Sequence, residues 1–233
     1  MLLFSDAHCH LQNATNPDMA INQARAHGVG KIVCAATRPD DWHSVCNIVS
    51  QHHDIHGTVG IHPWHATNIA PMWRDKMIQI LIQNPKLQIG EIGLDKYHPN
   101  MDTQIDIMCA QMKIAADLKR SVWIHCVGAW DKILKILKDQ RNNRPPYTVF
   151  HKFNGDVGII ERLINEYNAY FSFANNPKPQ TIAAIPIERI LTESDSDTPT
   201  YVVQNAQNIA NILNMDLNQL TSIVNNNLTK VLI

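Results

Sequence analysis

Short apolar segments alternate along this chain with longer segments in which apolar residues recur at helical spacing. The apolar segments predict eight strands, at Leu2–Asp6, Lys31–Ala36, Gly57–His62, Gln88–Gly93, Val122–His125, Thr148–His151, Tyr170–Phe173 and Arg189–Glu193. The segments between them predict helices at Pro17–His27, Pro39–Gln51, Pro71–Gln83, Asp102–Lys119, Trp130–Asp139, Val157–Tyr167 and Pro177–Ile185. A closing helical pair is predicted at Val202–Leu213 and Leu217–Asn227.

Strands that alternate with helices at this spacing indicate βαβ units and a parallel sheet. Eight strands in 233 residues favour an α/β fold of the closed (β/α)8 TIM type, with residues 1–233 as a single domain. A doubly wound open sheet is the main alternative. In a closed parallel barrel, the active site lies at the C-terminal ends of the strands, so polar residues at those ends are candidates for function.

The net charge and the cysteine content limit the binding partners and the cellular compartment that we expect. The formal net charge is −1, so no global field attracts nucleic acid or a membrane surface. The five cysteines include no Cys-x-x-Cys pair, which indicates reduced thiols in a cytoplasmic protein rather than a disulfide framework. We expect no signal peptide and no membrane span, because no apolar run approaches the roughly 20 residues that a span requires.

Six potential metal ligands fall at predicted strand ends. Side chains alternate along a strand, so His8 and His10 share one face, and Cys9 faces the core. The full set supplies four imidazoles and two carboxylates: His8, His10, Glu91, His125, His151 and Asp195. A lone histidine at a strand end is usually structural, but six such groups at one end of a sheet indicate a metal site. His27, His43, His52, His53, His56 and His98 fall elsewhere, and we assign them no role.

This ligand set exceeds the needs of one four-coordinate structural zinc. It predicts two divalent cations bridged by a carboxylate, with Glu91 as the bridge. Gly90 and Gly93 beside it would let other groups approach the backbone closely. Mixed histidine and carboxylate ligation suits Zn, Mn, Fe or Ni better than an all-oxygen Mg site. We expect Asp6 to orient one of the imidazoles from behind.

These motifs, in their order and spacing, resemble those of the TatD-type metal-dependent deoxyribonucleases, which are amidohydrolase-like barrels. The motifs are Asp6-x-His8-x-His10, Gly60-Ile61-His62-Pro63, the block from Gly90 to Asp95, Ile124-His125-Cys126, His151-x-Phe153-x-Gly155 and Glu193-x-Asp195-Ser196. The resemblance implies a cytoplasmic phosphodiesterase with two divalent cations that acts on DNA, often as a 3′→5′ exonuclease. It also implies that His8, His10, Glu91 and Asp195 bind one cation. Glu91, His125 and His151 would bind the other.

The chain departs from the family pattern in its positive charges. Val127 stands where the family usually has arginine, and Lys152 and Asn154 replace the usual cysteine and serine. The loop after Asp195-Ser196 is also shorter than is common in the family. These departures affect substrate range more than metal binding, because affinity for long polyanions rests largely on phosphate contacts.

The predicted chemistry is hydrolysis of a phosphodiester in DNA or in a small phosphodiester, with Asp195 and Glu91 as the catalytic carboxylates. His62 and Lys152 are candidates for contact with the phosphate, Trp64 for stacking on a terminal base, and Glu193 for support behind Asp195. Two alternatives remain: a hydrolase of esters or amides, including aminoacyl-tRNA esters, and a catalytically silent metal-binding barrel. No obligate protein partner is implied.

Overall fold

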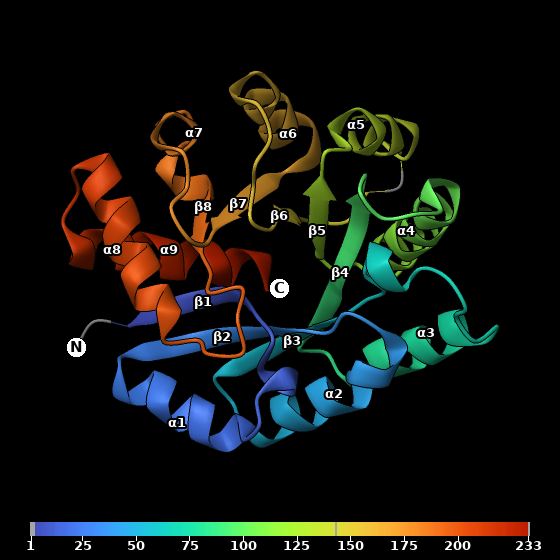
Figure 1. Ribbon diagram of the computed structural model, residues 1–233, viewed down its shortest axis with the longest axis horizontal. Helices are drawn as coiled ribbons and strands as arrows, with labels where there is room; N and C mark the ends of the chain where they lie inside the picture. The colour runs from blue at the N-terminus through green and yellow to red at the C-terminus, as the bar shows by residue number, and fades with distance from the viewer. Residues whose placement is uncertain (1–2, 143, 233) are drawn as a thin grey trace.

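The computed structural model describes residues 3–142 and 144–232, so the predicted strand residue Leu2 lies outside the described residues. The strands form one parallel sheet whose order follows the chain, and helices surround it (Figure 1). The strands are β1 (Phe4–Cys9), β2 (Val29–Ala35), β3 (Ile55–Val59), β4 (Leu87–Asp95), β5 (Val122–Val127), β6 (Thr148–Phe150), β7 (Ala169–Phe173) and β8 (Ile190–Thr192).

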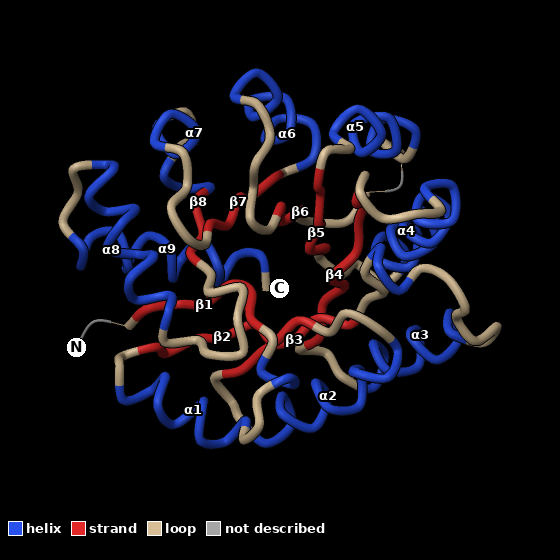
Figure 2. Tube along the Cα trace, viewed as in Figure 1, coloured by secondary structure: helices blue, strands red, loops and turns tan. Residues whose placement is uncertain are grey.

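The α-helices follow the strands in the predicted alternation, and Figure 2 shows all but the last of them outside the ring of strands. None of those in the described residues is long and apolar enough to cross a membrane. They are α1 (Pro17–Ala26), α2 (Trp42–Gln51), α3 (Trp73–Gln83), α4 (Met101–Asp117), α5 (Trp130–Asp139), α6 (Ile160–Tyr167), α7 (Pro179–Ala183), α8 (Tyr201–Leu213) and α9 (Leu217–Val231).

Contacts between β8 and β1 close the sheet. The hydroxyl of Thr192 donates to the carbonyl of Ser5 at 2.7 Å. Beyond the strand ends, the backbone N–H of Asp195 donates to the carbonyl of His8 at 2.9 Å. The predicted (β/α)8 barrel is therefore confirmed, and the alternative of an open doubly wound sheet is wrong.

Two hydrophobic clusters stabilise the barrel. The larger one lies between the strands and the surrounding helices. The smaller one fills the interior, where Trp123 on β5 spans the barrel and donates from Nε1 to the carbonyl of Ala7 on β1 at 2.8 Å. Leu228 and Val231 of α9 are fully buried in this inner cluster. The closing helix thus packs against the barrel interior as well as against the outer wall.

Local sequence explains where the helices begin. The side chain of Asn16 accepts a hydrogen bond from the backbone of Met19 at 3.0 Å, and Pro17 occupies the first turn of α1. Helix α7 begins later than the predicted Pro177–Ile185, because Lys178, which precedes Pro179, has an extended backbone with φ of −64° and ψ of 123°.

Truncation of the inner core should destabilise the barrel. We expect Leu228→Ala to lower the free energy of unfolding by about 2–5 kcal/mol, because it leaves a cavity among fully buried side chains. Urea unfolding followed by circular dichroism measures the change. The exposed Ser222→Ala on the same helix is the control and should stay within about 0.5 kcal/mol of the unsubstituted protein. Equal effects of the two substitutions would contradict a core role for α9.

Candidate metal centre

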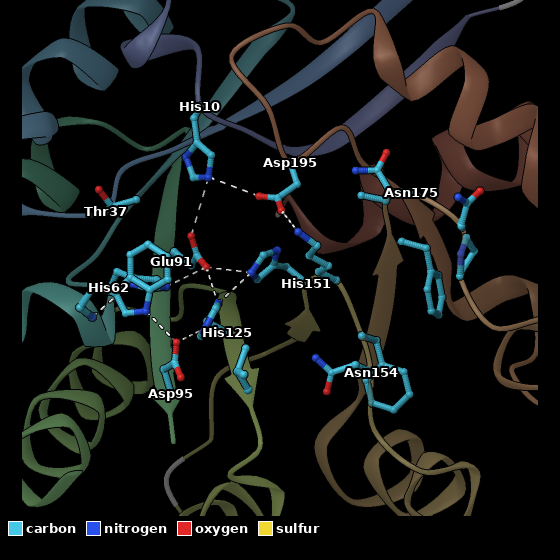
Figure 3. Close-up of a pocket in the computed structure, with 18 of the residues that line it drawn as sticks. His10, Thr37, His62, Glu91, Asp95, His125, His151, Asn154, Asn175 and Asp195 are labelled. Carbon is cyan, nitrogen blue, oxygen red and sulfur yellow. Dashed lines mark hydrogen bonds and ion pairs between the residues drawn. The ribbon is translucent and has the colours of Figure 1, made fainter. Parts of the chain in front are cut away.

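The predicted ligands converge toward the C-terminal side of the barrel, and Figure 3 labels all of them except His8, which lies beside Glu91 and Asp195. His8 lies within β1, which extends past its predicted end, and Glu91 lies in the middle of β4. The strands β3 and β6 end earlier than predicted, so His62 and His151 lie in the turns that follow them. Asp195 follows β8. The cluster therefore joins residues from nearly the whole length of the chain.

Glu91 is the centre of the cluster, and its two carboxylate oxygens face different histidines. Oε2 lies 3.4 Å from His8 Nε2 and 4.0 Å from His10 Nε2. Oε1 lies 2.9 Å from His125 Nδ1 and 2.7 Å from His151 Nε2. This division would allow one carboxylate to contact two cations.

Close backbone packing places Glu91 there. A Cβ atom on Gly60 would lie 2.5 Å from the carbonyl carbon of Gly90, so β3 can approach this peptide only without a side chain. A Cβ atom on Gly93 would lie 1.9 Å from the carbonyl oxygen of His125. The glycine-rich sequence around Glu91 thus brings β3 and β5 close to it, as the sequence predicted for Gly90 and Gly93.

Glu91 remains ionised although it is buried. Burial alone would raise the pKa of this carboxyl group, but the charges of His151 and His62 and the hydrogen bond with His125 hold it well below its ordinary value. The same carboxylate raises the pKa of His151 well above its ordinary value, against the opposing effect of burial. The centre of the cluster is therefore a strong attractor of positive charge.

Hydrogen bonds fix the tautomers of His10 and His62 in opposite ways. Nδ1 of His10 lies 3.0 Å from the carbonyl of Ala35, which can only accept, so Nδ1 carries the proton and Nε2 directs a lone pair into the cluster. Nδ1 of His62 accepts from the backbone N–H of Trp64 at 3.2 Å, so its Nε2 carries the proton. His10 is thus prepared to bind a cation, whereas His62 presents a donor, 3.4 Å from Glu91 Oε1.

Asp195 completes the side of the cluster near β1. Its Oδ1 lies 3.4 Å from His10 Nε2 and 3.9 Å from His8 Nε2, and its Oδ2 accepts from Lys152 Nζ at 2.7 Å. Burial would raise the pKa of Asp195, but the adjacent His10 ring, the charges of His151 and His8 and the hydrogen bond from Lys152 hold it well below its ordinary value. Asp195 is therefore an ionised carboxylate with one oxygen directed at the histidines.

Asp6 and Glu193 lie behind the cluster. Asp6 Oδ1 accepts from the backbone N–H of His8 at 3.2 Å and of Ser194 at 2.9 Å, so it holds the backbone of the site rather than an imidazole ring. Burial raises the pKa of Asp6 to about 8. Glu193 Oε1 accepts from the backbone N–H of Lys152 at 2.7 Å and lies 3.5 Å from His151 Nδ1.

The residues present fit divalent cations. His8 is fully buried, and neither of its ring nitrogens has a hydrogen-bond partner in the described part of the chain. Because buried polar atoms are normally paired, a lone pair at Nε2 that faces two carboxylates is suited to a cation. Three groups offer ligand atoms within 4.8 Å of one another: His8 with His10 and Glu91, His8 with His151 and Asp195, and His62 with Glu91 and His125.

These groups differ from the sets that the family resemblance implies. His151 joins His8, since the two rings stack with centroids 4.2 Å apart, and His62 takes its place beside Glu91 and His125. The hydrogen bond to Nδ1 leaves the proton of His62 on Nε2, whereas the proton of His10 lies on Nδ1.

A pocket of about 830 Å³ opens above the cluster. His62, Lys152 and Trp64, the predicted substrate contacts, all line it. Several other lining residues have no role predicted from the sequence, among them Asp95, Thr37, Arg38, Asn154 and Asn175. Asp95 alone carried a signal, because it ends the glycine-rich strand that contains Glu91. His98, which was also given no role, stacks on Trp64 with centroids 5.1 Å apart.

A parallel (β/α)8 barrel with histidines and carboxylates at its strand ends defines a class, that of the metal-dependent hydrolase barrels. The family described as TatD related DNase matches residues 5–232, and the chain belongs to this family.

Named relatives and solved structures agree with this assignment. The uncharacterized metal-dependent hydrolase YjjV of Escherichia coli is 26% identical, with 88% of this chain and 84% of that protein covered. The 3′-5′ ssDNA/RNA exonuclease TatD of Klebsiella pneumoniae is 25% identical, with 79% and 73% covered. The crystal structure of YjjV has a TM-score of 0.90 at 21% identity, with 99% of this chain and 98% of that chain covered. A TatD family hydrolase from Entamoeba histolytica has a TM-score of 0.85 at 17% identity, with 98% and 97% covered.

Removal of the central carboxylate should abolish tight metal binding. We expect Glu91→Gln to lower zinc affinity by at least about 100-fold, because the amide supplies no negative charge to either group of histidines. Titration of zinc against a competing chelator measures the affinity. The control Glu161→Gln, at an exposed position on α6, should bind zinc normally. Retention of normal zinc affinity by Glu91→Gln would show that the ions do not bind at this cluster.

Proposed function

We propose that this protein hydrolyses phosphodiester bonds at the 3′ end of single-stranded DNA with the help of two divalent cations. The observation that carries the proposal is Glu91, whose two oxygens face separate sets of imidazole nitrogens. Two adjacent cations suit the in-line displacement at phosphorus. Membership of the TatD related DNase family and the exonuclease name of the Klebsiella relative support the same substrate.

His8, His10, Glu91 and Asp195 would hold one cation. Glu91, His125 and His151 would hold the other. Together the cations would stabilise negative charge on the phosphate and lower the pKa of the attacking water. Zn, Mn, Fe or Ni fit this mixture of nitrogen and oxygen ligands, and Mg is a further candidate.

Asp195 is the general base of the proposed reaction. Its low pKa keeps it ionised, and its Oδ1 faces the centre of the cluster, where it orients the attacking water and accepts a proton. Lys152 contacts the other oxygen of Asp195, which restrains the orientation of the carboxylate. Glu91 remains the shared anchor throughout, because the imidazoles of His151, His62 and His125 favour its ionised form.

The substrate contacts follow from the pocket. His62 directs a protonated Nε2 into the site, and the half-exposed Lys152 supplies an ammonium group, so both suit non-bridging phosphate oxygens. The indole of Trp64 is 53% exposed at the pocket rim and suits a terminal base, since stacking contributes about 1–3 kcal/mol per base. The cavity volume lies in the range of small-ligand sites, which supports binding of a strand end.

The first test is degradation of single-stranded DNA labelled at its 5′ end, with Mg, Mn, Co or Zn added in turn. We expect stepwise shortening from the 3′ end, lost in the presence of chelator and reduced at least about 100-fold by Glu91→Ala, because both cation sites then lose a ligand. Glu161→Gln should retain activity. No cleavage with any of the four metals would refute the proposal. Metal-dependent turnover of esters or amides in its place would establish the alternative reaction.

Neutralisation of Lys152 tests the phosphate contact. We expect Lys152→Met to raise the KM for DNA about 10-fold, because a half-exposed charge-assisted hydrogen bond to phosphate is lost. The slope of log affinity against log salt should fall by about one. Lys152→Arg should preserve both values, and Lys135→Met on the exposed face of α5 is the matched control. An unchanged salt slope in Lys152→Met would exclude this lysine from phosphate binding.

A further inference from the structure

A second carboxylate approaches His125 from the side opposite Glu91. Nδ1 of His125 faces Glu91 Oε1 at 2.9 Å, and Nε2 faces Asp95 Oδ2 at 3.8 Å. In the described part of the chain, Nε2 of His125 is buried and has no hydrogen-bond partner. The separation exceeds a hydrogen bond. When a cation binds at Nδ1, that nitrogen must present its lone pair, so the proton lies on Nε2, where the ionised Asp95 stabilises it.

Asp95 is held firmly in this position. Its Oδ1 accepts from the backbone N–H of Tyr97 at 2.8 Å, and its Oδ2 accepts from Nε1 of Trp64 at 2.7 Å. The side chain of Gln104 binds the backbone of Asp95 twice. Its Oε1 accepts from the N–H of Asp95 at 2.9 Å, and its Nε2 donates to the carbonyl of Asp95 at 3.2 Å. Neither the strand end nor the carboxylate can rotate without breaking these bonds.

Trp64 connects this carboxylate with the mouth of the pocket. It lies in the short 3-10 helix η3 (Pro63–His65), and its ring stacks on His98 at an interplanar angle of 21°. The indole is therefore fixed by two contacts, one through its face and one through its N–H. Figure 3 shows Asp95 below His62 and His125, with dashed lines that link it to the cluster.

We propose that Asp95 is a positioning residue that sets the tautomer and orientation of His125, and that Trp64 holds Asp95 in place. A carboxylate that binds the far nitrogen of a ligating histidine fixes the ring and increases its basicity. Trp64 therefore supports metal binding through its N–H, in addition to any contact that its exposed aromatic face makes with substrate. The inference rests on His125 as a metal ligand, and it is independent of whether the substrate is DNA.

An amide could not replace Asp95. Both carboxylate oxygens accept from N–H groups, one from Tyr97 and one from Trp64. The amino group of an asparagine would oppose one of these donors, and its single oxygen could satisfy only the other. Asp95→Asn thus preserves size while it removes the charge and one of the two hydrogen bonds.

The test is zinc binding by the full-length protein without substrate. We expect Asp95→Asn to weaken binding of one zinc ion about 10- to 100-fold, the usual effect of losing such a partner. Trp64→Phe keeps an aromatic face and loses the N–H that binds Asp95, so it should weaken zinc binding about 10-fold. The control Tyr97→Ala should have no effect, because this side chain is 79% exposed and only its backbone contacts Asp95.

A double-mutant cycle tests the connection between the two residues. Trp64→Phe should weaken zinc binding in the unsubstituted protein but add nothing in the Asp95→Asn background, because it acts only through Asp95. Additive effects, or unchanged zinc affinity in Asp95→Asn, would overturn the proposal. If the protein does not cleave DNA, the zinc-binding results still test the role of Asp95, so each proposal can be refuted independently of the other.

Nitrogen NMR of the zinc-loaded protein identifies the protonated nitrogen of His125 and needs no substitution at Asp95. We expect His125 to be protonated at Nε2 and bound to zinc through Nδ1, with its signals assigned by their absence in His125→Gln. Zinc bound through Nε2, or a proton on Nδ1, would refute the positioning role even if Asp95→Asn failed to fold.

Discussion

The buried, ionised carboxylate of Glu91 is the interaction on which the arrangement of this molecule depends. A buried charge is costly unless it is paired, and neutral imidazoles donate few protons. The Nδ1 proton of His10, for example, is already directed at the carbonyl of Ala35. Positive charge must therefore enter the cluster, either as protons on residues such as His151 or as metal cations. Each neighbouring strand end is organised around this requirement.

The same residues close the barrel and form the site. Asp6 binds the backbone of both His8 and Ser194, and the backbone of Asp195 binds that of His8. The join between the first and last strands is thus made where the ligands gather. Substitutions of Asp6 would alter stability and metal binding together, because its hydrogen bonds join the two strand ends and also hold the backbone of His8.

The fold and the convergence of the six candidate ligands could be predicted, because both follow from local patterns. Alternation of short apolar and amphipathic segments indicates the barrel, and the barrel places the strand ends together. The opposite tautomers of His10 and His62, the stacking of His8 on His151, and the bond between Trp64 and Asp95 were not predicted. They depend on angles between strands and on the path of connecting loops, which residue spacing alone does not determine.

The cluster takes its residues from both ends of the chain, which determines when it can form during synthesis. His8 belongs to the first strand, and Asp195 follows the last, so a cation between them would act as a cross-link across most of the polypeptide. Closure of so long a loop is entropically expensive and requires that most of the chain has been synthesised. The ribosome therefore releases the first ligands long before their partners exist. Binding of metal by the whole cluster would therefore indicate that the barrel has closed.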